Sequence, residues 1–363
     1  MDLRDFDFDL PAELIAQEPP ARRGASRLLY LDRRTGVIEH TRIASLPERL
    51  QAGDVLAVND TRVFPARLLG VRVPTGGAVE CLLIRRLAAA SADRSDVDPS
   101  GGPGELWEAL MHPGQKLRAG ARVRFPGPSG AVNGEVLERR FYGRRAVRLW
   151  TDDGSPVDAA IDAIGHVPLP PYIHRPDRDD DRDRYQTMFA RARGSVAAPT
   201  AGLHFTPGLV AALSARGIDV VTLTLHVGYG TFQPIRSERV EEHRMDAEHF
   251  EIPGASADAI NRALDEGRRV IAVGTTTTRA LESTAARHGG RIAPGPGETD
   301  LFIFPGFTFR VLAGLLTNFH LPKSSLLLLV AAFAGRERVL TAYHEAVAER
   351  YRFYSYGDAM LIL

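Results

Sequence analysis

The hydrophobic pattern of this 363-residue chain changes its period along the sequence. Between residues 67 and 150, short runs of alternating apolar residues are separated by Gly, Pro and Asn, and no segment has a helical period. From Arg184 onward, strand-like apolar runs alternate with helix patterns. The first pattern indicates a small β-barrel or sandwich, and the second predicts a mainly parallel sheet covered by helices. We therefore expect an α/β domain formed by residues 1–66 and 151–363, with residues 67–150 inserted as a small β-barrel domain.

Local signals refine the α/β part. Thr206 followed by Pro207 and an apolar run predicts a capped helix that closes at Gly217. The runs on either side of Gly36 predict a hairpin, and the alternating DFDFD segment after Leu3 predicts a short strand. The apolar stretch 326–335 has about half of the roughly 20 residues that a membrane-spanning helix needs, so we expect a buried core helix there.

Composition excludes several classes of protein. Hydrophobic residues make up 44% and charged residues 25% of the chain, which is typical of a soluble globular protein. The single cysteine, Cys81, can form neither an internal disulfide nor a cysteine-rich zinc site. The acidic N-terminal segment lacks the features of a signal peptide, so we expect a cytoplasmic protein.

The charge balance gives no overall sign of a nucleic-acid partner, because Lys+Arg and Asp+Glu both number 45. Between Lys116 and Arg148, however, nine basic residues stand against two acidic ones. A basic face on a small barrel is suited to a phosphate backbone, and the alternative is an ordinary solvated surface in an arginine-rich chain. The candidates for backbone contacts are Arg139, Arg140, Arg144 and Arg145.

Four segments place polar groups at the ends of apolar strands, where open α/β sheets usually bind ligands. They are residues 59–68, 194–206, 225–234 and 317–322. A further segment, VGTTTT, begins a helix whose free N–H groups suit a carboxylate or a phosphate, although a simple helix cap is the alternative. The histidines at positions 204, 226, 243 and 320 lack the spacing of metal ligands, so we expect no metal.

In this order, these segments closely resemble the S-adenosylmethionine:tRNA ribosyltransferase-isomerases of queuosine biosynthesis. The resemblance runs nearly from end to end and is most specific in the unusual runs GSVAAPTAGLHFT, LHVGYGTFQPI, AVGTTTTRALES and TNFHLPKSS. It implies a transferase that moves and isomerises the ribosyl part of S-adenosylmethionine onto 7-aminomethyl-7-deazaguanine at the tRNA wobble position. The implied products are epoxyqueuosine in tRNA, adenine and methionine. S-adenosylmethionine is consumed as a substrate, and the resemblance implies no metal or redox cofactor.

The implied reaction also suggests roles for particular residues. The reaction needs a base and an acid, for which the candidates are His204, His226 and His320. From their residue types, Asp60 and Arg62 are expected near the deazaguanine or the anticodon backbone, because a carboxylate can accept from a guanine-like edge and an arginine can pair with phosphate. The S-adenosylmethionine pocket is expected to be lined by Thr200, Gly228, Tyr229, Gly230, Thr231, Thr275, Thr276 and Asn318.

The chain departs from the family pattern at two positions. Asp246 replaces a histidine that commonly follows the methionine of the family's HxMH segment, and Thr277 replaces a serine but keeps the hydroxyl. Two other functions stay open at this point. One is a non-enzymatic RNA-binding protein that uses the basic barrel, and the other is a methyltransferase that would release S-adenosylhomocysteine.

Overall fold

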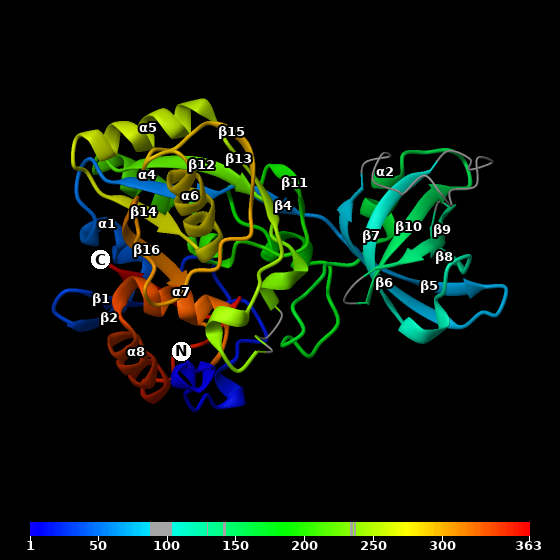
Figure 1. The fold of residues 1–363 in the computed structure, drawn as a ribbon, viewed down its shortest axis with the longest axis horizontal. Coiled ribbons are helices and arrows are strands. Elements are labelled where there is room, and N and C mark those ends of the chain that lie inside the picture. The colour runs from blue at the N-terminus through cyan, green and yellow to red at the C-terminus, as the bar shows by residue number, and fades with distance from the viewer. Residues whose placement is uncertain (88–103, 129, 141–142, 233–234, 236) are drawn as a thin grey trace.

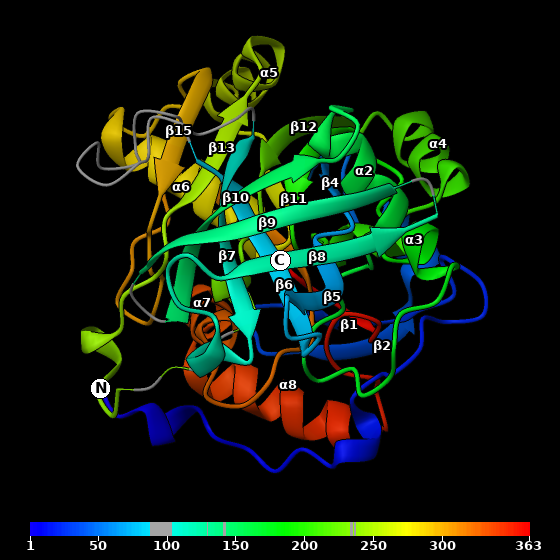
Figure 2. The same ribbon diagram turned by 90° about the vertical axis from the view of Figure 1, so that its right-hand side faces the viewer.

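The computed structural model describes residues 1–87, 104–128, 130–140, 143–232, 235 and 237–363, with the side chains of residues 231 and 232 left out. The chain forms a large α/β part and a small barrel, which lie side by side in Figure 1. Figure 2 looks onto the barrel, where strands β8 and β9 cross the face nearest the viewer. The α/β class and the inserted barrel are therefore confirmed.

The α/β part is built on a nine-stranded sheet. Its strands, in spatial order, are β15 (Gly295–Thr299), β13 (Glu248–Ile252), β12 (Asp219–Leu225), β3 (Val55–Asn59), β14 (Val270–Val273), β16 (Leu312–Asn318), β17 (Ala359–Ile362), β1 (Arg27–Leu31) and β2 (Ile38–Arg42). The central strands β12, β3, β14 and β16 run parallel. Four of the eight neighbouring pairs in the sheet are antiparallel, so the sheet is mixed rather than mainly parallel.

Helices cover both faces of this sheet. One face packs against α5 (Gly254–Asp265), α6 (Thr275–Arg287), α7 (Ser325–Ala334) and α8 (Arg336–Ala348). The other packs against α1 (Leu46–Arg49), α4 (Pro207–Ala215) and the 3₁₀ helix η6 (Thr200–His204). Along β3, Val55 and Ala57 belong to the first core and Leu56 and Val58 to the second, as expected for a strand that is buried on both faces.

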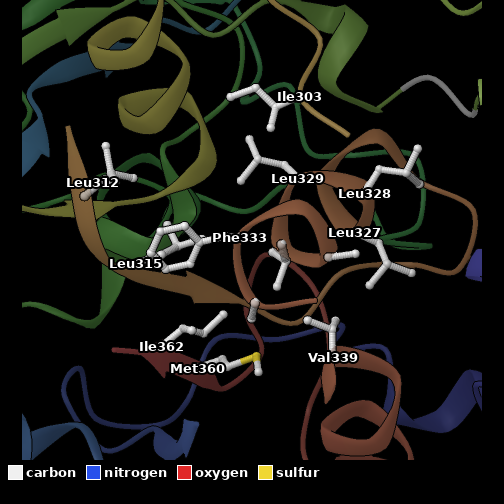
Figure 3. Packing of buried hydrophobic residues seen from close by; sticks show 14 of the residues in the cluster. Ile303, Leu312, Leu315, Leu327, Leu328, Leu329, Phe333, Val339, Met360 and Ile362 are labelled. Carbon is white, nitrogen blue, oxygen red and sulfur yellow. The ribbon is translucent and has the colours of Figure 1, made fainter. Parts of the chain in front are cut away.

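Helix α7 confirms the core helix expected at residues 326–335. Leu327, Leu328 and Leu329 are buried, and Figure 3 shows them packed with residues of β16 and β17. Ser324 begins the helix by accepting a hydrogen bond from Leu327 N at 3.2 Å. No helix in the described part of the chain is long and apolar enough to cross a membrane.

The barrel is closed by six strands. They are β5 (Arg67–Val73), β6 (Ala78–Arg86), β7 (Glu105–His112), β8 (Arg122–Gly127), β9 (Gly130–Arg139) and β10 (Arg144–Thr151), and the 3₁₀ helix η4 (Gly114–Lys116) follows β7. Helix α2 (Val157–Ile164) places Val157 and Ile161 in the barrel core, so the packing of this part extends beyond residue 150.

Short elements join the two parts. Strand β4 (Thr61–Val63) pairs in parallel with β11 (Ala192–Ser195), and both lie between the sheet and the barrel in Figure 1. The remaining short elements are α3 (Asp181–Arg184), η2 (Ala12–Leu14), η3 (Ile43–Ser45), η7 (Tyr229–Phe232) and η8 (Val240–Glu242).

The strand expected after Leu3 is wrong. Residues Leu3–Phe6 form the 3₁₀ helix η1, which Asp2 caps by accepting a hydrogen bond from Arg4 N. Phe6 and Phe8 are buried in the same core as α7, so their alternation reflects two anchoring rings rather than strand pairing.

Candidate functional site

The carboxyl ends of the parallel strands meet at one edge of the sheet, as they must in any parallel arrangement. Asn59 ends β3, Asn318 ends β16, and His226 and Val227 follow β12. Helix α6 begins directly after β14, at Gly274, whose φ of 93° is easily adopted only by glycine. Chain segments that are distant in sequence are therefore brought together at this edge.

A narrow pocket lies at this edge, with a free volume of about 40 Å³; we call it the sheet-edge pocket. Five of the predicted site residues line it together: Thr200, Thr275, Thr276, Asn318 and His320. Its other lining residues are Tyr172, Ala197, Ala198, Pro199, Ala201, Val227, Gly274, Thr317, Leu326, Tyr354 and Ser355.

The polar groups of the sheet-edge pocket come from the first turn of helix α6 and from the side-chain amide of Asn318. The first N–H groups of α6 have no partner within the helix, and Thr275 and Thr276 border the pocket there. Thr277 points elsewhere, because its hydroxyl donates to the Val273 carbonyl at 2.8 Å. Asn318 is 2% exposed; its amide nitrogen donates to the Tyr354 carbonyl, whereas its Oδ1 atom has no hydrogen bond. The pocket thus offers unsatisfied donors and one unsatisfied acceptor.

His320 is fixed inside this pocket. Its Nε2 atom lies 2.9 Å from Thr317 Oγ1, and its backbone N–H donates to the Tyr343 hydroxyl. Burial lowers the pKa of His320 to about 3. The imidazole is therefore neutral near pH 7 and weakly basic.

His204 lies in an adjoining hollow rather than in the sheet-edge pocket. Its Nδ1 atom is 2.9 Å from Ser26 Oγ, and its Nε2 atom makes no hydrogen bond of normal geometry. Burial lowers the pKa of His204 to about 4, although the nearby Asn318 side chain favours the charged form. This histidine is also neutral near pH 7.

His226 is the most accessible of the three histidines and lines a wider cavity between the sheet and the barrel. Its Nδ1 atom lies 2.9 Å from Thr61 Oγ1, which in turn lies 2.9 Å from Ser195 Oγ. Ser195 Oγ accepts from Val227 N at 2.7 Å, so its own proton is directed to Thr61. Partial burial lowers the pKa of His226 from its ordinary value, and the charge of His249 acts in the same direction.

The three histidines do not converge on one point, but their pockets adjoin. Val227 lines both the sheet-edge pocket and the wider cavity of His226. Ser355 lines both the sheet-edge pocket and the hollow of His204. The three predicted catalytic histidines therefore lie in neighbouring spaces that are separated by shared wall residues.

Asp60 does not occupy the position expected for it. Its side chain is 1% exposed, one carboxylate oxygen accepts from Arg191 at 2.8 Å, and the other accepts from Thr224 Oγ1 at 2.5 Å. With both oxygens engaged inside the protein, Asp60 is a structural carboxylate rather than a group that recognises a base. Arg62 is exposed on β4.

The segment after His226 only partly joins the predicted pocket. Gly228 lines the cavity of His226, and its N–H donates to Glu248 at 2.9 Å. Tyr229 packs against the barrel core, and a Cβ at Gly230 would clash with Asp246. None of the three borders the sheet-edge pocket, whose described lining includes only Val227 from this segment. The side chain of Thr231 lies outside the described residues.

The four arginines predicted to contact phosphate differ sharply. Arg145 is 2% exposed and donates to the carbonyls of Leu117, Gly143 and Gly114. The prediction for Arg145 is therefore wrong, because its guanidinium is occupied in holding the barrel loops. Arg139 is exposed on the barrel surface.

Arg140 and Arg144 belong to ion pairs. Arg140 bonds Glu138, and Arg144 contacts both Glu108 of the barrel and Asp246 of the α/β part. Asp246, which departs from the family pattern, thus joins the two parts of the molecule.

Sequence reasoning missed two features of these sites. Glu248 and Arg279 form a buried ion pair beneath the segment of Gly228. Trp107 and Phe64 form an aromatic wall in the cavity of His226, with ring centroids 5.7 Å apart. These residues come from separate segments, and only the tertiary fold brings each pair together.

The chain is similar over its whole length to known proteins. A family model described as "Queuosine biosynthesis protein" matches residues 3–362. S-adenosylmethionine:tRNA ribosyltransferase-isomerases of Desulfitobacterium hafniense and Geobacter metallireducens are each 50% identical, over the full length of both chains. The crystal structure of S-adenosylmethionine tRNA ribosyltransferase from Thermotoga maritima is 36% identical and has a TM-score of 0.53; the match covers 99% of this chain and all of that one.

Proposed function

The chain belongs to the family of queuosine biosynthesis proteins, and from this membership we propose that it is an S-adenosylmethionine:tRNA ribosyltransferase-isomerase. It transfers the ribosyl part of S-adenosylmethionine to 7-aminomethyl-7-deazaguanine at the tRNA wobble position, in the cytoplasm. The products are epoxyqueuosine in tRNA, adenine and methionine. The observation that carries this proposal is the gathering of five expected site residues in one pocket at the carboxyl edge of the sheet.

The sheet-edge pocket suits the amino-acid end of S-adenosylmethionine. The start of the 13-residue helix α6 attracts a carboxylate through its free N–H groups and the helix dipole. The Oδ1 atom of Asn318 is a buried acceptor for the ammonium group. The free volume of about 40 Å³ is too small for the whole donor, so the ribosyl and adenine parts extend past Val227 toward the cavity of His226.

The chemistry requires proton transfer beside this position. The sulfonium acidifies the ribose carbon bonded to sulfur, so a base can remove a proton there. Adenine leaves as its bond to the ribosyl carbon breaks, and it takes up a proton. The aminomethyl nitrogen forms a bond to a ribosyl carbon and loses a proton. The carbon–sulfur bond breaks to release methionine as a ribosyl oxygen closes the epoxide.

His226 is the base that best fits this requirement. It is only partly buried and borders an open cavity, whereas His204 and His320 are almost fully buried, and burial lowers the pKa of each of the three. Thr61 can donate either to His226 Nδ1 or to the Ala192 carbonyl, so this hydroxyl pair supports either neutral tautomer of the ring. His204 and His320 then act by positioning groups around the pocket.

The test is product analysis. The purified protein is incubated with S-adenosylmethionine and tRNA bearing 7-aminomethyl-7-deazaguanine, and adenine, methionine and nuclease-digested tRNA are analysed. Adenine and epoxyqueuosine together are the expected result. Release of S-adenosylhomocysteine would instead identify a methyltransferase, and tRNA binding without either product would identify an RNA-binding protein. The His288→Gln variant, altered at an exposed histidine beyond the end of α6, serves as the control and should keep full activity.

A further inference from the structure

The hollow that contains His204, which we call the His204 hollow, adjoins the sheet-edge pocket and shares Ser355 with it. Its free volume is about 20 Å³, whereas one water molecule needs roughly 10–15 Å³. Among its lining residues, Pro20 and Arg23 are partly exposed and His204 is buried, so the hollow leads inward from the protein surface. It has room for one small group, such as a phosphate or a carboxylate, but not for a base or a sugar.

Two arginines without an acidic partner line the His204 hollow. In the described part of the chain, neither Arg23 nor Arg184 forms an ion pair. Arg23 donates to the carbonyls of Gln186 and Asp183, at 2.7 and 3.0 Å. Arg184 donates to the carbonyl of Pro20. A carbonyl accepts a hydrogen bond but carries no net charge, so the positive charges of both arginines stay uncompensated.

The acidic side chains around these arginines do not neutralise them. Asp181 accepts hydrogen bonds from Arg175 and from the Tyr356 hydroxyl. Glu18 also pairs with Arg175. Asp183 is exposed, does not line the hollow, and forms no ion pair with any residue that the structure describes. The His204 hollow therefore keeps an excess of positive charge.

The two arginines are close enough to repel each other. The pKa of Arg23 is lowered from its ordinary value, first by burial and then by the charge of Arg184, although Asp183 acts in the opposite direction. At His204, where burial is the main cause of the lowered pKa, the charge of Arg23 acts in the same direction as burial. An anion between these groups would replace the repulsion by attraction.

His204 supplies a further donor to the hollow. Its Nδ1 atom lies 2.9 Å from Ser26 Oγ, and its Nε2 atom makes no hydrogen bond of normal geometry among the described residues. A neutral imidazole accepts through one ring nitrogen and donates through the other. When the Ser26 hydroxyl donates to Nδ1, the ring proton is therefore on Nε2, where a group that enters the hollow can accept it.

We propose that the His204 hollow is a phosphate-binding site, in which Arg23 and Arg184 bracket one phosphate group and His204 Nε2 donates to it. Two guanidinium groups and a ring N–H suit the several oxygen atoms of a phosphate better than the two of a carboxylate. Inorganic phosphate and a backbone phosphate of tRNA offer the same chemistry. The tRNA source rests on the proposed function, whereas the site itself does not.

The first arm of the test uses inorganic phosphate and no RNA. The melting temperature is followed as phosphate replaces chloride at constant ionic strength, with acetate as the carboxylate probe. The test variants are Arg23→Gln and Arg184→Gln. The control is Arg22→Gln, which removes the same charge from an exposed side chain without a partner among the described residues. Phosphate should raise the melting temperature of the wild type and of Arg22→Gln, and this gain should be lost in both test variants.

The second arm measures the affinity for tRNA at several salt concentrations. Each test variant should weaken binding about tenfold or more, as the loss of a charge-assisted hydrogen bond would. Because both arginines hold one group, the double variant should lose less than the product of the two single losses. Its slope of log K against log salt should fall by about 0.7, which corresponds to one phosphate of a single strand. Arg22→Gln should keep the wild-type slope.

The two arms distinguish the sources of the phosphate. A loss in the first arm identifies inorganic phosphate as a ligand, and a loss in the second identifies a backbone phosphate. The proposal is overturned if both test variants behave like Arg22→Gln in both arms. An equal gain in melting temperature from acetate would also overturn it, because the site would then not select phosphate.

A variant that keeps the charge separates binding from folding, because the Gln variants also lose hydrogen bonds to carbonyls. Arg184→Lys keeps a positive charge without the geometry of the guanidinium group. Its melting temperature without phosphate should resemble that of Arg184→Gln, but it should retain most of the phosphate or tRNA response. If Arg184→Lys loses as much binding as Arg184→Gln, Arg184 acts only on the fold and the site is rejected.

The phosphate site and the proposed function fail in different ways. If the wild-type protein releases neither adenine nor epoxyqueuosine, the proposed function fails, and the response to inorganic phosphate still decides the site. If turnover is normal and the variants of Arg23 and Arg184 match the control in both arms, only the phosphate site fails.

Discussion

At the scale of single residues, the three candidate histidines differ mainly in burial. His204 and His320 are 3% and 5% exposed, whereas His226 is only partly buried and borders the larger cavity. Burial disfavours the charged imidazolium, and this explains why the pKa is lowered to about 4 for His204 and to about 3 for His320. The pH dependence of turnover should therefore come from His226, and the pH dependence of the unfolding free energy should come from His204 and His320.

We expect turnover to depend on the neutral form of His226. Its pKa lies below the ordinary 6.5, so the rate should be level near pH 7 and should fall on the acid side with a midpoint below 6.5. The His226→Gln variant should lose about 10²-fold or more in turnover and should lack this acid limb. Single-turnover adenine release between about pH 5 and 8 measures both effects. A variant that keeps the same acid limb would show that another group is the base.

His204 and His320 should make the fold sensitive to acid. Between about pH 6.5 and 4 the unfolded chain binds a proton at each of these positions and the folded chain does not, so stability falls as pH falls. Each histidine should cost about 1.4 kcal/mol of unfolding free energy per pH unit in this range. Urea unfolding at several pH values measures the slope, and His320→Gln should reduce it by one proton. An unchanged slope in that variant would mean that His320 is protonated in the folded state.

At the scale of elements, helix α4 shows how local signals fix a boundary. Thr206 accepts a hydrogen bond from Leu209 N at 3.2 Å, and Pro207 occupies the first helical position, as the sequence predicts. Replacing Thr206 by Ala should lower the unfolding free energy by about 1 kcal/mol, whereas Thr206→Ser should have little effect. Equal loss in both variants, measured by urea unfolding, would assign the effect to the lost methyl group rather than to the cap.

The elements that sequence reasoning recovered are those set by neighbouring residues. The hairpin of β1 and β2, the start of α4 and the core helix α7 each depend on signals within about ten residues. Strand β17 depends on distant pairing, with β16 on one side and β1 on the other, and its residues carry no turn signal that would mark it. The mixed character of the sheet follows from such pairings, so a local pattern could not show it.

The same distinction applies to the sites. Thr200, Thr275, Thr276, Asn318 and His320 were predictable because each lies at a strand end or a helix start, and those ends meet at one edge. The roles of Asp60 and Arg145 were not predictable, since whether a charged side chain faces solvent or protein partners is decided by residues far away in sequence. Arg191 lies 131 residues from Asp60, and the three carbonyls bound by Arg145 belong to separate turns of the barrel.

At the scale of the whole molecule, the cavity of His226 lies where two separately packed parts meet, whereas the sheet-edge pocket is lined by the α/β part. The barrel has its own core, which Phe64, Val196 and α2 join from outside the six strands. The ion pair between Arg144 and Asp246 crosses the same boundary. A large substrate such as tRNA can therefore contact the barrel and the α/β part together.

On the barrel surface, we expect Arg139 to contact the tRNA backbone and Arg145 to stabilise the fold. Arg139 is exposed, so Arg139→Ala should weaken tRNA binding and should reduce the slope of log K against log salt by about 0.7 to 0.9, as the loss of one phosphate contact would. Arg145 is buried among three carbonyl acceptors, so Arg145→Ala should lower the melting temperature and leave the salt slope unchanged. Salt-dependent tRNA titrations and thermal unfolding of both variants provide the comparison. A guanidinium group that binds a phosphate releases the counterions of that phosphate, whereas a guanidinium group buried in the protein releases none. A reduced slope for a folded Arg145→Ala protein would therefore contradict the structural role of Arg145. An unchanged slope for Arg139→Ala would contradict the phosphate contact of Arg139.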